Sequence, residues 1–220
     1  MIRPAFLSAI LLAVPLACLA PAQTAAPLVV TGVVQPVPGP TICMQGETHL
    51  LDCTQVFLRS NAIDLNALVG QNVRLTGLDI GVTCTVIEVI ASAPANPTLE
   101  WCGTPAPGCS VKFKLCPGMI AAAGLFVSTA PGFLPIFLPL NGTPEAVLLS
   151  FPVTPIPVAP SPSGCFDVTV PIPPLLSLVG AAFWLQGARM DIGPAGPMQL
   201  SNAVCLTILP PSPFCAVPGC

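Results

Sequence analysis

The sequence is poor in groups that ionise. Charged residues make up 7% of its 220 residues, whereas about a quarter is usual in a soluble protein. The formal net charge is −3, and Lys and Arg form no cluster along the chain. Nucleic-acid binding depends on basic side chains that neutralise phosphates. A nucleic-acid partner is therefore disfavoured.

The residue sets of common catalytic chemistry are also missing. The chain has no tyrosine and one histidine, His49. No serine stands in a Gly-x-Ser-x-Gly setting, as a nucleophile elbow would require. The nine acidic residues show neither the spacing of an acid–base pair nor that of a calcium loop. We expect a non-catalytic protein without metal or cofactor, and a secreted hydrolase that uses His49 is the weaker alternative.

The amino terminus has the composition of a secretory signal peptide. Residues 5–17 are almost wholly apolar and follow a short basic start. The tripeptide Ala20-Pro21-Ala22 fits the small-x-small rule for cleavage. We expect residues 1–22 to be removed, so that the mature chain begins near Gln23. Lipid attachment at Cys18 is an alternative.

Cysteine is abundant. Ten of the eleven cysteines would remain after cleavage, and an even set behind a signal peptide indicates disulfides in an oxidising compartment. No Cys-x-x-Cys pair occurs, which argues against a zinc or thioredoxin-type site. If bridges stay within each half of the chain, four cysteines allow three pairings and six allow fifteen. The candidates are Cys43, Cys53, Cys84, Cys102, Cys109, Cys116, Cys165, Cys205, Cys215 and Cys220.

Two long uncharged runs, 115–144 and 168–188, raise the alternative of a membrane-inserted protein. Both contain several prolines, and lipid offers no partner for the backbone groups that broken segments leave free. We therefore expect no integral membrane segment after signal removal.

Residues 28–92 are expected to form a small five-stranded β-barrel. Asp64 can cap a short helix by accepting a backbone N–H, and Gly70 can end it. Runs of β-branched and alternating residues predict the strands at 28–34, 48–52, 55–59, 72–79 and 83–90.

This pattern, with a capped helical turn between the third and fourth strands, resembles the OB-fold. The Val-Thr-Gly start and the segment 64–77 are similar to secreted bacterial OB-like modules. The resemblance implies a ligand face on the second and third strands, where His49, Phe57 and Arg59 are the candidates. Trp101 could stack on a sugar ring. An OB-type binding module for oligosaccharide or peptide is therefore one hypothesis for the function.

The second half is expected to be an antiparallel β-sandwich over residues 109–209. A proline-bearing linker, 93–108, would precede it and a Pro/Cys-rich tail, 210–220, would follow. Strands are predicted at 110–116, 122–129, 146–152, 165–172, 182–192 and 202–208.

Within these strands the alternation places Cys116, Cys165 and Cys205 on the solvent side, as staples across the sheet surface. Gly187 is expected at a bulge, and Trp184 in the core.

Segments 170–173, 178–187 and 200–208 resemble a carboxy-terminal β-sandwich domain of secreted proteins from planctomycete-type bacteria. That family has no settled activity, so the resemblance implies location and architecture only. Our first hypothesis is an exported structural or adhesion protein, secreted, periplasmic or at the cell surface. Envelope polysaccharide or surface proteins would be its partners.

Overall fold

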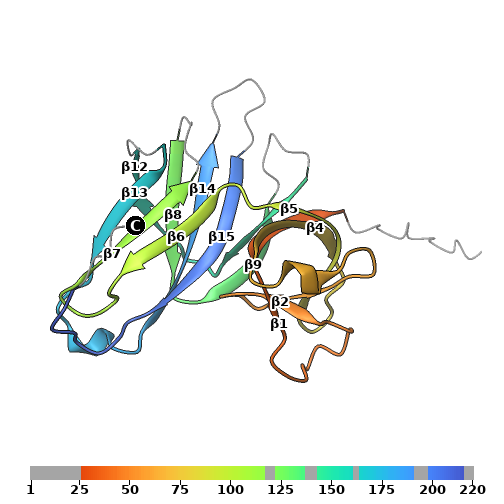
Figure 1. The fold of residues 1–220 in the computed structure, drawn as a ribbon, viewed down its shortest axis with the longest axis horizontal. Helices are drawn as coiled ribbons and strands as arrows, with labels where there is room; N and C mark the ends of the chain where they lie inside the picture. The colour runs from red at the N-terminus through yellow and green to blue at the C-terminus, as the bar shows by residue number, and fades with distance from the viewer. Residues whose placement is uncertain (1–25, 117–121, 137–142, 161–163, 191–197, 216–220) are drawn as a thin grey trace, which may run out of the picture.

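The computed structural model describes residues 26–116, 122–136, 143–160, 164–190 and 198–215. The expected signal peptide, Cys18 and Cys220 lie outside the described residues. The described chain is all-β with two short 3-10 helices, and it forms two lobes that lie side by side (Figure 1). None of the helices in these ranges is long and apolar enough to cross a membrane.

The first lobe is a closed five-stranded barrel, as the sequence predicts. Its strands run in the order β2-β3-β5-β4-β1, and pairing of β2 with β1 closes it. β3 and β5 are parallel, and the other neighbours are antiparallel. The strands are β1 (Leu28–Pro36), β2 (His49–Leu51), β3 (Val56–Arg59), β4 (Asn72–Asp79) and β5 (Thr85–Pro94).

A 3-10 helix, η1 (Leu65–Leu68), connects β3 to β4. The Asp64 carboxylate accepts a hydrogen bond from the Asn66 backbone N–H at 2.9 Å, which confirms the expected cap. Strand order and helix position together are those of an OB-like barrel.

Alternating side chains fill the barrel. Leu51, Leu58, Leu75 and Ile87 are fully buried, each contributed by a different strand. Gly77 of β4 lies at a bulge, where a Cβ would approach an Ile87 methyl carbon to 2.5 Å. Only glycine lets β4 and β5 approach this closely.

Two further strands extend the barrel sheet. β10 (Glu145–Leu149) runs parallel to β1, with Val29 opposite Glu145. β9 (Pro131–Ile136) pairs antiparallel with β10. The segment expected at 146–152 as a sandwich strand thus lies in the sheet of the barrel.

The second lobe is a β-sandwich of two four-stranded sheets. One has the order β11-β8-β14-β15 and the other β12-β13-β7-β6. The bounds are β6 (Thr98–Gly103), β7 (Ser110–Cys116), β8 (Ala122–Ser128), β11 (Thr154–Pro157), β12 (Ala159–Pro160), β13 (Phe166–Pro171), β14 (Ala182–Met190) and β15 (Met198–Thr207).

Several sequence expectations for this lobe can be compared with the structure. The register of β14 and β15 shifts between Gln186 and Ala188, which confirms the bulge at Gly187. The expected linker 93–108 contains β6, an edge strand of the second sheet. Trp184 is only half-buried and is not a core residue, because its neighbours Phe183 and Leu185 are the ones that pack against the sandwich core.

Candidate ligand-binding groove

Disulfides join segments that are distant in the sequence. The four described pairs are Cys43–Cys84, Cys53–Cys205, Cys109–Cys215 and Cys116–Cys165, and Cys102 is also disulfide-bonded. This confirms the expected disulfide framework. The assumption that bridges stay within each half is wrong, since Cys53 of the barrel pairs with Cys205 of the sandwich.

One of these bridges shapes an end of the barrel. Cys43 lies in the loop between β1 and β2, and Cys84 ends the loop between β4 and β5. Their Cα atoms are 5.6 Å apart. In OB-like barrels these two loops flank the ligand face of the second and third strands, so the bridge holds both walls of that face together.

A groove of about 770 Å³ lies beside this bridge. It is lined by Phe57 of β3, Gln55 just before that strand, Thr85 of β5, Asp79 at the end of β4, and Phe133 of β9. A second hollow of about 420 Å³ is formed by residues 37–42 of the β1–β2 loop and again by Phe57. The Phe57 ring, half-buried, is therefore shared by two neighbouring hollows.

The groove has little charge. Asp79 is the one ionisable side chain of its lining, and one of its carboxylate oxygens accepts the Gly81 N–H at 2.9 Å. Amide and hydroxyl groups come from Gln55, Thr83 and Thr85. A lining of two phenylalanine rings, hydrogen-bonding side chains and no cation suits an uncharged polar ligand.

The rim of the groove is apolar. Ile42 and Met44 flank Cys43, and Val82 lies two residues before Cys84. Their exposed fractions are 88%, 91% and 86%. Such exposed apolar side chains, gathered beside a groove, are typical of an interaction surface.

Arg59 does not line the groove, but it holds the β1–β2 loop, one of the groove walls, in place. Its guanidinium donates to the Gln45 carbonyl at 2.7 Å and to the Glu88 carboxylate at 3.0 Å. The hydrogen bond from Arg59, followed by one from Asn61, lowers the pKa of Glu88 below its ordinary value. Arg59 therefore anchors the β1–β2 loop to β3 and β5, and its charge is already paired.

The other two predicted ligand residues lie elsewhere. His49 is 3% exposed and points into the barrel, where its Nδ1 is hydrogen-bonded to the Thr48 hydroxyl at 2.8 Å. Trp101, 37% exposed, lies on β6 of the sandwich. The structure thus brings together Phe57 and Arg59 of the four predicted residues, and it places His49 and Trp101 apart from them.

Sequence reasoning missed most of the groove. Gln55, Asp79 and Thr83 carry no motif, and only the convergence of two loops places them together. The β strand that contributes Phe133 was not predicted at all. The expected OB resemblance was the one signal that pointed to these loops.

Across the described ranges, no group of three or more His, Cys, Asp or Glu residues is placed to hold a metal ion. Comparison of the chain with protein-family models, with curated proteins and with solved structures found no match.

Proposed function

We propose that this protein is an exported, non-catalytic adhesion module whose barrel groove binds a neutral oligosaccharide of the cell envelope or extracellular matrix. The observation that carries the proposal is the position of Phe57, between two hollows at a disulfide-clamped end of the barrel. An aromatic face beside hydroxyl, amide and carboxylate groups matches the alternating apolar faces and hydroxyl edges of a sugar chain.

The size and charge of the groove support this ligand class. Its volume of about 770 Å³ falls within the range of small-ligand sites, roughly 300–1,000 Å³. The absence of Lys and Arg from the lining disfavours phosphate-bearing ligands. A peptide could add to an open sheet edge. Pairing of β2 with β1 closes the barrel wall, and the edge strand beside the groove, β9, contains Pro131 and Pro135, which lack backbone donors.

Export is supported by the disulfides. Such bridges persist in oxidising compartments and are rare in the cytosol, and here they connect loops, tail and both lobes. The low charge of the chain also suits a surface protein that must adhere without electrostatic steering.

The binding experiment compares two phenylalanines. Phe57→Ala removes the ring from the groove, and Phe214→Ala removes a ring that is 78% exposed in the tail and lies outside the groove lining. We expect the oxidised mature protein to bind immobilised neutral oligomers of glucose, galactose, mannose or N-acetylglucosamine. The Phe57→Ala variant should bind about tenfold more weakly, as expected for loss of one aromatic contact, while Phe214→Ala binds like the wild type.

Two results would contradict the proposal: binding of no member of this panel, or equal binding by both variants. A purely structural role would then be favoured, because the covalent link between the lobes suits a load-bearing surface component.

A further inference from the structure

The sandwich lobe contains an apolar cavity of about 230 Å³ that is partly open to the surface. It lies between the two sheets, with walls from Phe113 of β7, Val127 of β8, Ile156 of β11, Val170 of β13 and Leu206 of β15. Every residue that lines it is Val, Leu, Ile, Phe or Pro. The cavity is separate from the barrel groove and shares no lining residue with it.

A void of this size is unusual in a folded core. Protein interiors are packed about as densely as organic crystals and contain few voids larger than a water molecule. The lining offers water none of the two to four polar partners that it needs, and enclosed apolar cavities of about 150 Å³ take up apolar molecules. The cavity is therefore suited to an apolar occupant.

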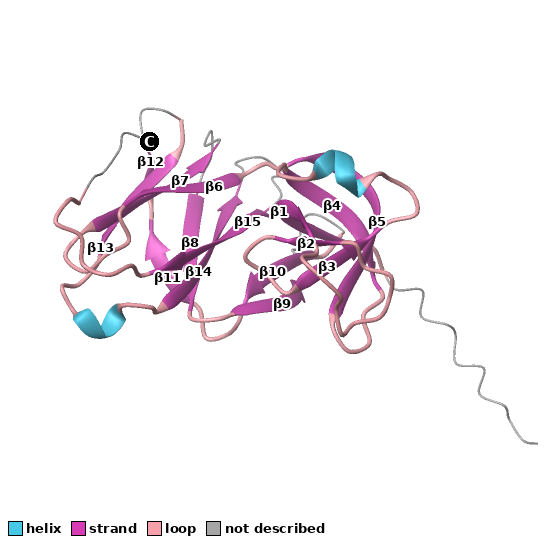
Figure 2. Ribbon diagram, turned by 60° about the horizontal axis from the view of Figure 1, so that its bottom comes forward, coloured by secondary structure: helices cyan, strands magenta, loops and turns pink. Residues whose placement is uncertain are grey.

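One end of the cavity communicates with the surface. Ile156, Val170 and Leu178 line it and are only half-buried. Leu178 closes η2 (Leu176–Leu178), a 3-10 helix at the end of the sandwich away from the barrel (Figure 2).

Exposed apolar side chains surround this end. Leu175 and Leu176 are 55% and 70% exposed, and Val179 is 38% exposed. Leu209, 47% exposed, follows the lining residue Ile208. Because Gly180 donates to the Ile208 carbonyl at 2.8 Å, the segment after η2 and the segment after β15 are adjacent, and both carry exposed leucines nearby, which we call the rim.

The residues near the mouth of the cavity also limit the charge of a ligand. Residues 168–188, which contain η2 and the parts of β13 and β14 next to it in the chain, carry no charged side chain. The nearest cation along β7, Lys112, is paired with Asp167 at 3.0 Å. A carboxylate at the mouth would lack a counter-ion, so the head group must be uncharged.

We propose that this cavity binds a single alkyl chain of an amphiphile with an uncharged head group. A group the size of a water molecule occupies roughly 30 Å³ of liquid, so the cavity holds a chain of roughly eight carbons. The chain fills the space between the sheets, and its head lies among the leucines of the rim.

Titration calorimetry with 1-octanol tests the site. We expect one saturable site per chain, and octanoate, which carries a charge, should bind at least tenfold more weakly. Val170→Phe places a ring in the cavity and should abolish octanol binding. Thr169→Phe makes the same kind of enlargement on the exposed face of the same strand and should leave binding unchanged. Ile156→Phe replaces Val170→Phe if that variant does not fold.

Absence of saturable octanol binding, or equal binding by the Val170→Phe and Thr169→Phe variants, would overturn the proposal. Octanoate binding as tight as that of octanol would contradict the uncharged head group. Phe57→Ala should leave octanol binding unchanged. The test of the cavity is therefore independent of the test of oligosaccharide binding in the groove.

Flotation with phosphatidylcholine vesicles distinguishes a bilayer lipid from a free amphiphile as the source of the alkyl chain. Retention on vesicles that Val170→Phe abolishes and Thr169→Phe preserves would identify a bilayer lipid as the source. Octanol binding without retention would identify a free amphiphile, and retention that both variants share would exclude the cavity as the lipid site.

Discussion

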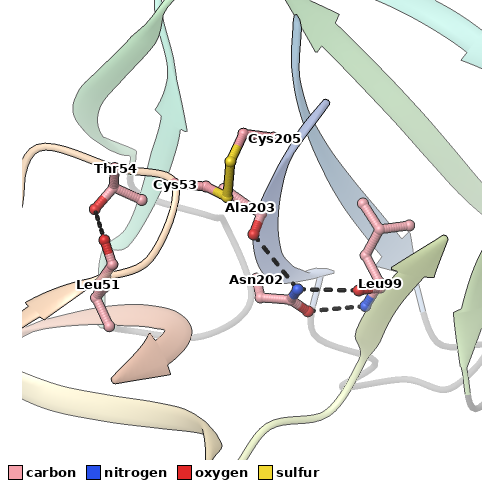
Figure 3. The surroundings of a disulfide bond; sticks show 7 residues. All are labelled: Leu51, Cys53, Thr54, Leu99, Asn202, Ala203 and Cys205. Carbon is pink, nitrogen blue, oxygen red and sulfur yellow. Dashed lines mark hydrogen bonds between the residues drawn. A yellow bond between two sulfur atoms is a disulfide. The ribbon is translucent and has the colours of Figure 1, made fainter. Parts of the chain in front are cut away.

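Cys53 and Cys205 form a disulfide between the β2–β3 turn of the barrel and β15 of the sandwich (Figure 3). Their Cα atoms are 5.3 Å apart although 152 positions separate them in the sequence. Two residues earlier on β15, Ala203 is part of the hydrophobic core of the barrel. The strand therefore pairs within the sandwich while its Ala203 packs into the barrel core, and the bridge joins the two lobes covalently beside it.

The same strand connects the lobes through a buried amide. Asn202, 3% exposed, donates to the Leu99 carbonyl at 3.0 Å and accepts from the Leu99 N–H at 2.8 Å. Its oxygen also accepts from the Asn72 side chain of the barrel at 2.9 Å. Asn202→Ala should lower the free energy of unfolding by about 2–4 kcal/mol, because buried backbone groups of Leu99 lose their partners. Urea denaturation measures it, with the exposed Asn61→Ala as control. A loss below about 0.5 kcal/mol would contradict this role.

A buried ion pair also lies at the junction. Arg74 of β4 pairs with Glu145 of β10, and the other Glu145 oxygen accepts the Leu200 N–H of β15 at 2.7 Å. Glu145 is 1% exposed. Arg74→Leu should destabilise the protein by about 3–5 kcal/mol, because removing one partner of a buried ion pair is strongly destabilising. Lys112→Ala, which breaks a more exposed pair with Asp167, should cost less than about 1 kcal/mol. Equal losses in thermal unfolding would contradict this difference.

The loop-clamping bridge should matter for binding. The double variant Cys43→Ala/Cys84→Ala frees the β1–β2 loop from the β4–β5 loop, so the walls of the groove no longer hold their spacing. We expect binding of the neutral oligosaccharide identified with the wild type to weaken by about tenfold or more, since ordering two loops opposes binding. Cys109→Ala/Cys215→Ala, which frees the tail, is the matched control. Surface plasmon resonance that gave the same affinity for both double variants would show that the clamp is dispensable.

The ionisation of Glu88, which pairs with Arg59, should make the stability of the protein depend on pH. Because the pKa of Glu88 is lowered in the folded protein, its ionised form stabilises the fold above the ordinary pKa of a glutamate. That stability is lost as the pH falls through the lowered pKa. The stability advantage of the wild type over Glu88→Gln should therefore be greatest near neutral pH and shrink in acid. Urea titrations at a series of pH values measure it, and an advantage that grew in acid would contradict the Arg59–Glu88 pairing.

The barrel could be predicted from the sequence because its signals are local. Alternation defines its strands, and the expected bounds of β4 agree with the structure. Asp64 caps the helix that follows β3. In the same way β7 alternates, and its bounds are those expected.

The segments that were missed depend on long-range contacts. β9 contains Pro131 and Pro135, which favour a loop when read locally, yet the strand lies at an edge of the sheet, where missing donors are tolerated. Small residues and prolines around β6 predict a linker when the sequence is read locally. Only pairing with β7 makes it a strand.

The ligand face could be predicted only in part, and the reason is again a long-range one. His49 and Phe57 lie on neighbouring strands, and which of them points outward depends on the strand register. The pairing of His49 with Leu58 directs the histidine inward, and the pairing of Leu50 with Phe57 directs the ring outward. Disulfide partners raise the same difficulty. Cys116 of β7 pairs with Cys165, which precedes β13 and is 8% exposed, so the expected solvent-side position of Cys165 is wrong. Only the packing of the two lobes brings Cys205 to Cys53.

Peptide mapping under non-reducing conditions, on the mature protein isolated from its own cells, tests the account most directly. We expect crosslinked peptides that contain Cys43 with Cys84 and Cys53 with Cys205, and no free thiol at these four positions. Free thiols there, or Cys53 paired with another cysteine of the barrel, would contradict both the covalent junction of the lobes and the clamped groove.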